Sequence, residues 1–179
     1  MRYKEKFLIY TWLGALIFIL IIGIFFCFQR PSVEIIKAEQ SLVTTSEKIR
    51  AFYRNRPDYW GLSHTSVISQ KLYDGTIVEN KILNSLGKEV VVGGNSSGSQ
   101  VMPGSRSFVV TYKELNRQEC IEISAFRGRE QDRLGLIAMS IRNETGVFEF
   151  NWGNKGLPLS KNQAKKYCTE KNDIMWTFE

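Results

Sequence analysis

The feature that most constrains this chain is an apolar run near its N-terminus. Residues 7–28 read FLIYTWLGALIFILIIGIFFCF and carry no charged side chain. As a helix, a run of this length spans roughly 33 Å, which is enough for the hydrocarbon core of a bilayer. A buried helix of a globular domain seldom stays apolar on every side for more than about 14 residues. The run therefore predicts a membrane-spanning helix, and we expect residues 7–28 to contact lipid.

The residues before this run predict its orientation. Arg2, Lys4 and Lys6 precede it and are opposed only by Glu5. The positive-inside rule keeps such an N-terminus in the cytoplasm and exports the chain that follows. The end of the run offers no small-x-small cleavage site, which favours a retained anchor over a cleaved signal peptide. We therefore expect a single-pass protein with a cytoplasmic start and an anchor over residues 1–30.

The length and composition of the remaining chain predict one exported domain. The protein has 179 residues, so roughly 150 remain after the anchor, which is the usual size of one domain. With 43% hydrophobic and 23% charged residues, the chain has enough apolar material to fold. The net charge is +6, but the basic residues are interspersed with acidic ones, as in residues 127–133. This spread is typical of a solvated surface, and we expect no nucleic-acid partner.

An amphipathic helix is predicted directly after the anchor. No Gly or Pro occurs from residue 32 to residue 53. Ile35, Leu42 and Ile49 recur every seven residues, and Ala38 and Phe52 lie beside them on the same predicted apolar stripe. Such a stripe must pack on something. We therefore expect residues 31–57 to continue the N-terminal helix and residues 58–179 to form a head domain against which its stripe packs.

The head shows the alternation that is typical of β-strands. Phe108–Tyr112 and Ile174–Phe178 alternate in this way. Three further runs are predicted as strands: the short β-branched run Glu89–Val92, and Leu136–Ile141 and Val147–Trp152, which residues 143–146 join as a hairpin. Two short helices are predicted by capping pairs, which are Asn116 with Glu119 and Ser160 with Gln163. Residues 62–87 predict only a short helix near Ser66–Tyr73. The predicted fold class is α+β, with a long N-terminal helix, half anchor and half amphipathic, packed on a small antiparallel sheet.

Two of the three cysteines are placed to form a disulfide. Cys120 lies on the apolar face of the first short helix, and Cys168 is expected on the apolar face of the second. Both belong to the exported domain, where an oxidising compartment lets thiols pair. We therefore expect a Cys120–Cys168 bridge and interpret Cys27, at the outer end of the anchor, as a plain thiol in the membrane.

The search for catalytic chemistry finds little. His64 is the single histidine, and no second histidine or cysteine pair stands at metal-ligand spacing around it. Ser85 and Lys88 match the S-x-x-K spacing of serine acylating enzymes, but Gly87 and the β-branched run after it oppose the required helix. Nucleotide-binding and zinc-protease motifs are absent. We expect no catalytic, cofactor or metal site and no small-molecule substrate.

The layout and the C-terminal half resemble the type IV pilins. The residues that carry the resemblance are FVVTYKEL over 108–115 followed by Gln118-Glu119-Cys120, then Ala164 to Cys168, then IMWTF over 174–178. They resemble the strands and short helices around the two pilin cysteines, in particular in the type IVb group that includes the PilS-like conjugative pilins. The resemblance implies a long bent helix against an antiparallel sheet, the same Cys120–Cys168 pair, and a non-enzymatic role in pilus assembly, with cell adhesion or conjugation as its setting.

The resemblance also bears on processing. Pilin precursors are cut after a Gly, and the fifth residue of the mature helix is a Glu. A cut between Gly14 and Ala15 would put Ile19 at that position, and residues 7–28 contain no Glu. In pilins that carboxylate pairs with a neighbouring subunit's N-terminal amine inside an apolar core. The resemblance therefore favours a minor pilin or an uncut pilin-like protein of the bacterial inner membrane, with other pilin subunits and inner-membrane assembly proteins as partners.

A function of another class is left open. A membrane-anchored periplasmic domain that binds a ligand or catalyses a reaction would need a concave pocket with converging polar groups. His64, Arg127 and Arg129 are the residues that would line such a pocket.

Overall fold

The computed structural model describes residues 32–125, 135–152 and 156–179. The predicted anchor, with Gly14, Ala15 and Cys27, lies outside these residues. Among the helices of the described ranges, none is both long and apolar enough to cross a membrane. Val33–Glu179 forms one compact unit.

The first described element is the helix α2 (Val33–Tyr53), as the periodicity predicts. Ile35, Leu42 and Ile49 are buried along one face. Phe52, which the sequence assigns to the same stripe, is 40% exposed, and its neighbour Tyr53 is buried instead. The reason is the helical period. At 3.6 residues per turn Tyr53 lies about five whole turns after Ile35 and so on the same side of the helix, whereas Phe52 points about 100° away from that side. A seven-residue repeat cannot follow this face, because its positions drift around the helix by about 20° per heptad.

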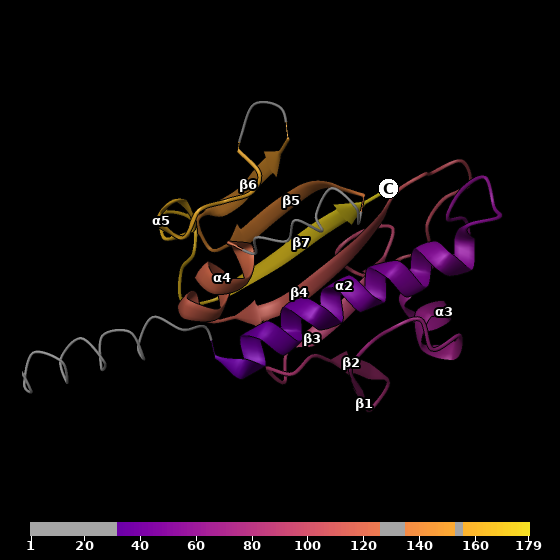
Figure 1. Ribbon diagram of the computed structural model, residues 1–179, viewed down its shortest axis with the longest axis horizontal. Coiled ribbons are helices and arrows are strands. Elements are labelled where there is room, and N and C mark those ends of the chain that lie inside the picture. Colours follow the sequence, from indigo (N-terminus) through magenta and orange to yellow (C-terminus); the bar gives the residue numbers. More distant parts are fainter. Residues whose placement is uncertain (1–31, 126–134, 153–155) are drawn as a thin grey trace, which may run out of the picture. The chain divides into compact units, whose positions relative to one another are not determined.

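In the described residues the strands form one antiparallel sheet of seven, in the order β1-β2-β3-β4-β7-β5-β6 (Figure 1). The bounds are β1 Thr76–Val78, β2 Lys81–Leu83, β3 Glu89–Gly93, β4 Phe108–Leu115, β5 Leu136–Asn143, β6 Gly146–Asn151 and β7 Asn172–Phe178. The last strand of the chain thus lies inside the sheet, paired with β4 on one side and β5 on the other. The α+β class and the five predicted strands, observed as β3, β4, β5, β6 and β7, are confirmed.

The hairpin of β1 and β2 has no counterpart among the predicted elements. Val78 pairs with Lys81, so Glu79 and Asn80 form a two-residue turn, and both have positive φ, 49° and 63°. Such turns favour Asn-Gly or Asp-Gly, and the Glu-Asn pair gives no such signal. Each strand is also only three residues long, which is too short for an alternating pattern to be recognised.

The helix α3 (His64–Ser69) begins and ends earlier than the predicted Ser66–Tyr73. Ser63 caps it: the Ser63 hydroxyl accepts from the Ser66 backbone, and the Ser66 hydroxyl accepts from the Ser63 backbone. The usual partner in this reciprocal box is Glu or Gln, so a serine in that place is a weak signal in the sequence. Lys71, with a φ of 54°, follows the end of the helix.

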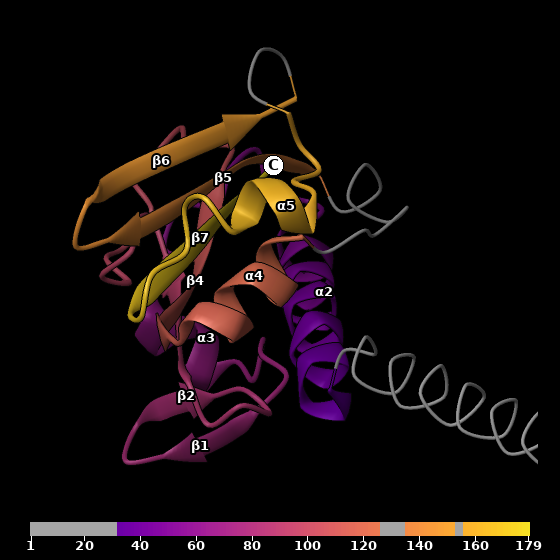
Figure 2. The same cartoon turned by 90° about the vertical axis from the view of Figure 1, so that its left-hand side faces the viewer.

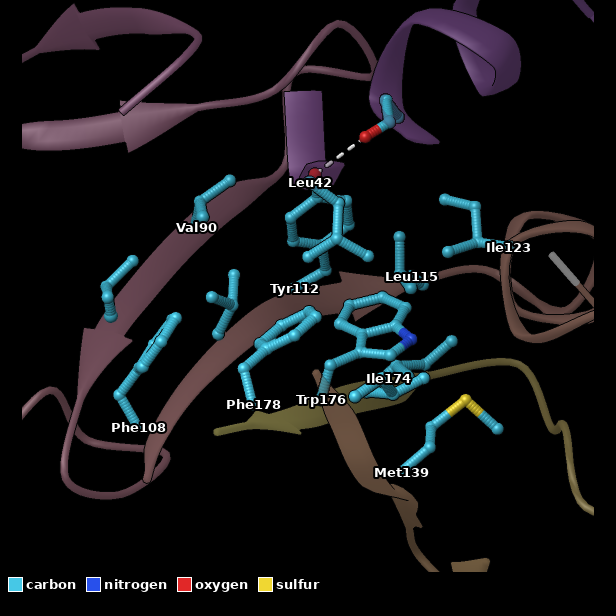
Figure 3. Close-up of a cluster of buried hydrophobic side chains, with 14 of the residues drawn as sticks. Leu42, Val90, Phe108, Tyr112, Leu115, Ile123, Met139, Ile174, Trp176 and Phe178 are labelled. Atoms are coloured by element: carbon cyan, nitrogen blue, oxygen red, sulfur yellow. Dashed lines mark hydrogen bonds between the residues drawn. The ribbon is translucent and has the colours of Figure 1, made fainter. Parts of the chain in front are cut away.

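The core lies between α2 and the sheet. Figure 2 shows α2 and α4 (Arg117–Ser124) on the same side of the central strands. The fully buried Tyr112 of β4 donates a 2.7 Å hydrogen bond from its hydroxyl to the carbonyl of Ala38 in α2 (Figure 3). The rings of Tyr112 and Trp176 pack in a T-shaped arrangement, with their centroids 5.0 Å apart. The hydrogen bond satisfies a buried hydroxyl and ties the helix to the middle of the sheet.

Candidate functional site

A disulfide joins Cys120 and Cys168, the pair expected from the sequence, with a Cα–Cα distance of 5.9 Å. Cys120 is buried in α4, which begins at the predicted capping pair. The Asn116 side chain accepts from the Glu119 backbone, and the Glu119 carboxylate accepts from the Asn116 backbone. Two of the orphan N–H groups of α4 are thereby satisfied, which defines where the helix starts and which face carries the cysteine.

Cys168 differs from its prediction in one respect. The helix α5 covers only Lys161–Ala164, so Cys168 lies four residues after the end of the helix and not on it. Its backbone N–H still donates to the Ala164 carbonyl at 3.0 Å, and that of Tyr167 does so at the same distance. The chain therefore keeps a helix-like course that turns Cys168 inward without forming further turns of α5.

Polar contacts hold the disulfide-linked segment against the sheet. The buried Asn172 at the start of β7 donates to the carbonyls of Leu115 (3.1 Å) and Thr169 (2.7 Å). Lys161 of α5 pairs with Glu122 of α4 at 2.5 Å. Together with the bridge, these contacts join α4, α5 and the start of β7 into one corner of the head.

This corner also meets α2 at Glu39. Burial raises the pKa of the Glu39 carboxyl from 4.5 to about 7, and the charge of Glu122 adds to the rise, while Lys161 opposes it. Because the folded-state pKa lies above the unfolded value, ionising Glu39 costs stability. The contribution of the protonated Glu39 to the free energy of unfolding is therefore fully present below about pH 4.5, and it is lost as the pH rises through about 7.

Replacing Glu39 with glutamine is therefore expected to stabilise the protein at pH 8 and to leave it unchanged near pH 4. The gain is at most about 3 kcal/mol, and the remaining solvent contact of Glu39 reduces it. The measurement is thermal melting of both proteins across this pH range. Glu47→Gln, at an exposed position on the same helix, is the control, and an equal gain for both variants would contradict the burial of Glu39 as the cause.

A surface cleft of about 660 Å³ lies at the other end of α2. Its lining comes from the end of α2, the loop after it, the loop before β4 and the end of β7: Glu47, Arg50, Ala51, Tyr53, Arg54, Arg56, Pro57, Asp58, Tyr59, Arg106 and Glu179. In Figure 1 these elements meet near the C-terminal end of β7. We call it the arginine cleft.

Backbone contacts between two loops build this cleft. The N–H of Tyr59 donates to the carbonyl of Ser105 at 3.1 Å, and the N–H of Gly104 donates to the Asp58 carboxylate at 2.7 Å. Gly104 has a φ of 81°, a conformation that glycine adopts without strain. The loop before β4 is thus held beside the loop that leaves α2, which brings Arg106 to the end of the helix.

The residues singled out in the sequence for chemistry do not converge on one place. His64 begins α3, and its backbone N–H donates to Gly98. Ser85 donates to the Glu34 carbonyl at 2.6 Å, whereas Lys88 donates to the Glu114 carbonyl at 3.0 Å.

Within the described ranges no group of His, Cys, Asp and Glu side chains could hold a metal ion. Arg127 and Arg129 lie outside those ranges. The arginine cleft was not predicted: Arg50, Arg54 and Arg56 are close in sequence, but nothing in the sequence relates them to Arg106.

Comparison with known proteins gives similarity in structure only. No protein-family model matches the chain, and no curated protein matches it. A type IVb pilin from Salmonella typhi aligns at 14% identity over 80% of this chain and 95% of its own, with a TM-score of 0.48. TcpA, a type IV pilin from Vibrio cholerae El Tor biotype, aligns at 13% identity over 83% of this chain and 100% of its own, with a TM-score of 0.55. The fold implied by the resemblance is thereby confirmed: the chain has a type IV pilin-like α+β fold.

Proposed function

We propose that this protein is a subunit of a type IVb or conjugative pilus system, either a minor pilin or a pilin-like membrane-anchored component. The observation that carries the proposal is the extent of the match to TcpA. The aligned region includes the whole of that pilin and 83% of this chain, so the likeness extends over helix and head together. The disulfide between Cys120 and Cys168 supports the same reading, because the sequence resemblance requires it.

Apolar residues at the start of α2 support a role in assembly. Val33 is 62% exposed and Ile36 is 41% exposed, although both lie on a helix whose opposite face is buried in the head. Exposed apolar side chains at the start of α2 suit contacts with the helices of other subunits. Since residues 7–28 also contain no Glu, we favour an accessory subunit over the major one.

The proposed location follows from the anchor. Residues 7–28 hold the protein in the bacterial inner membrane, the head lies in the periplasm, and assembly proteins of that membrane are the partners. The rival function, a periplasmic ligand-binding or enzymatic domain, expects a pocket lined by His64, Arg127 or Arg129. His64 lines none of the three clefts named for the described residues, and Arg127 and Arg129 lie outside those residues.

The test is genetic and biochemical. Deleting the gene in its host should reduce the number of surface pili, and mechanically sheared filaments should contain the protein in amounts well below the major subunit. Complementation with the full chain should restore pili, whereas a variant that lacks residues 7–28 should not, since it has lost its anchor. Normal piliation in the deletion strain, together with absence of the protein from sheared filaments, would refute the proposal.

A further inference from the structure

The arginine cleft has an excess of positive charge. Of the described residues that line it, four are arginines and three are carboxylates, Glu47, Asp58 and Glu179. The arginines come from two places in the sequence, residues 50–56 and residue 106. A volume of about 660 Å³ is in the range of small-molecule sites.

One of the carboxylates is already engaged by the backbone. The two oxygens of Asp58 accept from different backbone groups, the N–H of Trp60 at 3.2 Å and the N–H of Gly104 at 2.7 Å. The bond from Gly104 joins the two loops, and the bond from Trp60 lies within the loop of Asp58 itself, so Asp58 cannot turn toward a guanidinium without releasing them. Arg50 is also engaged, because it makes a side-chain hydrogen bond with Tyr59.

The other three arginines make no ion pair with any residue in the described ranges. Arg56 lies over the rings of Phe52 and Tyr53, 5.1 and 4.8 Å from their centroids, which restrains its side chain. Arg54 and Arg106 are exposed. By contrast, four lysines elsewhere in the head are paired with carboxylates, three of them within 3.1 Å.

The end of α2 explains only part of this cluster. A helix C-terminus carries about half a negative charge, which Arg54 or Arg56 alone would offset. Arg106 belongs to a different segment and adds a further charge beside the same opening. Arg54, Arg56 and Arg106 line one cleft without an ion pair in the described ranges, although Glu47 and Glu179 line it as well. Guanidinium groups left in this state are suited to bidentate binding of oxyanions.

We propose that the arginine cleft binds a ligand with two or more oxyanion groups, carboxylate or phosphate, held chiefly by Arg54 and Arg106. This inference goes beyond the assembly function, since a pilus subunit needs no such ligand. It also departs from the expectation, drawn from the sequence alone, that no small molecule is bound. Its failure would leave the pilus proposal untouched.

The test is calorimetric titration of the full chain, in a nonionic detergent at low salt, with citrate and separately with pyrophosphate. Saturable binding of at least one of them is expected. Arg54→Ala/Arg106→Ala should weaken it by roughly tenfold for each guanidinium removed. Lys165→Ala/Lys166→Ala removes the same charge from an exposed site next to α5 and should leave the affinity within about twofold. The affinity of Arg54→Lys/Arg106→Lys should fall between those of the other two variants, because lysine keeps the positive charge but cannot form the bidentate hydrogen bonds of a guanidinium group.

The two titrants separate the possible sources of the oxyanion. Tighter binding of citrate identifies a carboxylate ligand, and tighter binding of pyrophosphate identifies a phosphate ligand, and either supports the proposal. The proposal would be overturned if neither citrate nor pyrophosphate showed saturable binding. It would also be overturned if Lys165→Ala/Lys166→Ala lost as much affinity as Arg54→Ala/Arg106→Ala. A change of self-association in the arginine variant, measured by sedimentation and without oxyanion binding to the parent, would also overturn it and make the cleft a contact between copies of the chain.

Discussion

Replacing Cys120 with serine is expected to lower the free energy of unfolding by about 2–5 kcal/mol. The bridge joins positions 48 residues apart, so reduction releases a long loop in the unfolded chain. Both sulfurs are buried, and a serine at position 120 would also place a hydroxyl in the core. A domain of this size typically has about 5–15 kcal/mol in total, so much of its stability depends on this one bond.

The measurement is denaturant unfolding of the purified protein, with a non-reducing peptide map of the parent to verify the pair. Cys168→Ser should cost a similar amount, and the double variant Cys120→Ala/Cys168→Ala should cost less than the sum of the two single variants, because one bond is lost in every case. Cys27→Ser is the control and should leave stability unchanged. A Cys120→Ser protein as stable as its parent would remove the disulfide as a main support of the head.

The second large effect is expected for Trp176→Ala, at about 3–5 kcal/mol of destabilisation. Trp176 is 1% exposed and lies on β7, where it pairs with Val110 of β4 and Met139 of β5. Its ring contacts Tyr112, whose hydroxyl holds α2 (Figure 3). Removal of the indole therefore leaves a cavity between the middle of the sheet and the helix that covers it, and the surrounding side chains can close it only in part.

Trp60→Ala is the matched control for this experiment. The same side chain is removed, but Trp60 is 58% exposed, so the loss should stay below about 1 kcal/mol. Both variants are compared with the parent by chemical denaturation at one pH. Similar losses for the two variants would mean that the contact of Trp176 with Tyr112 does not hold the core together.

Local sequence patterns determined much of the secondary structure. The caps at Asn116 and Ser160 were recognised because each is a short-range exchange of hydrogen bonds within four residues. The strand of Phe108 and the strand of Trp176 were recognised because alternation is a property of a single strand facing a core. The pairing of Cys120 with Cys168 was predictable because these are the two cysteines of the exported domain, and an oxidising compartment lets thiols pair.

Tertiary structure decided what depends on distant partners. Nothing local places β7 between β4 and β5, because strand order is set by which faces and edges meet in the folded head. The β1–β2 hairpin likewise gains its stability from the neighbouring β3, with which β2 pairs. The arginine cleft is the clearest case. Arg54 and Arg106 line the same cleft because Asp58 and Tyr59 bind the loop before β4, and contacts between segments so far apart in the chain leave no periodic trace in the sequence.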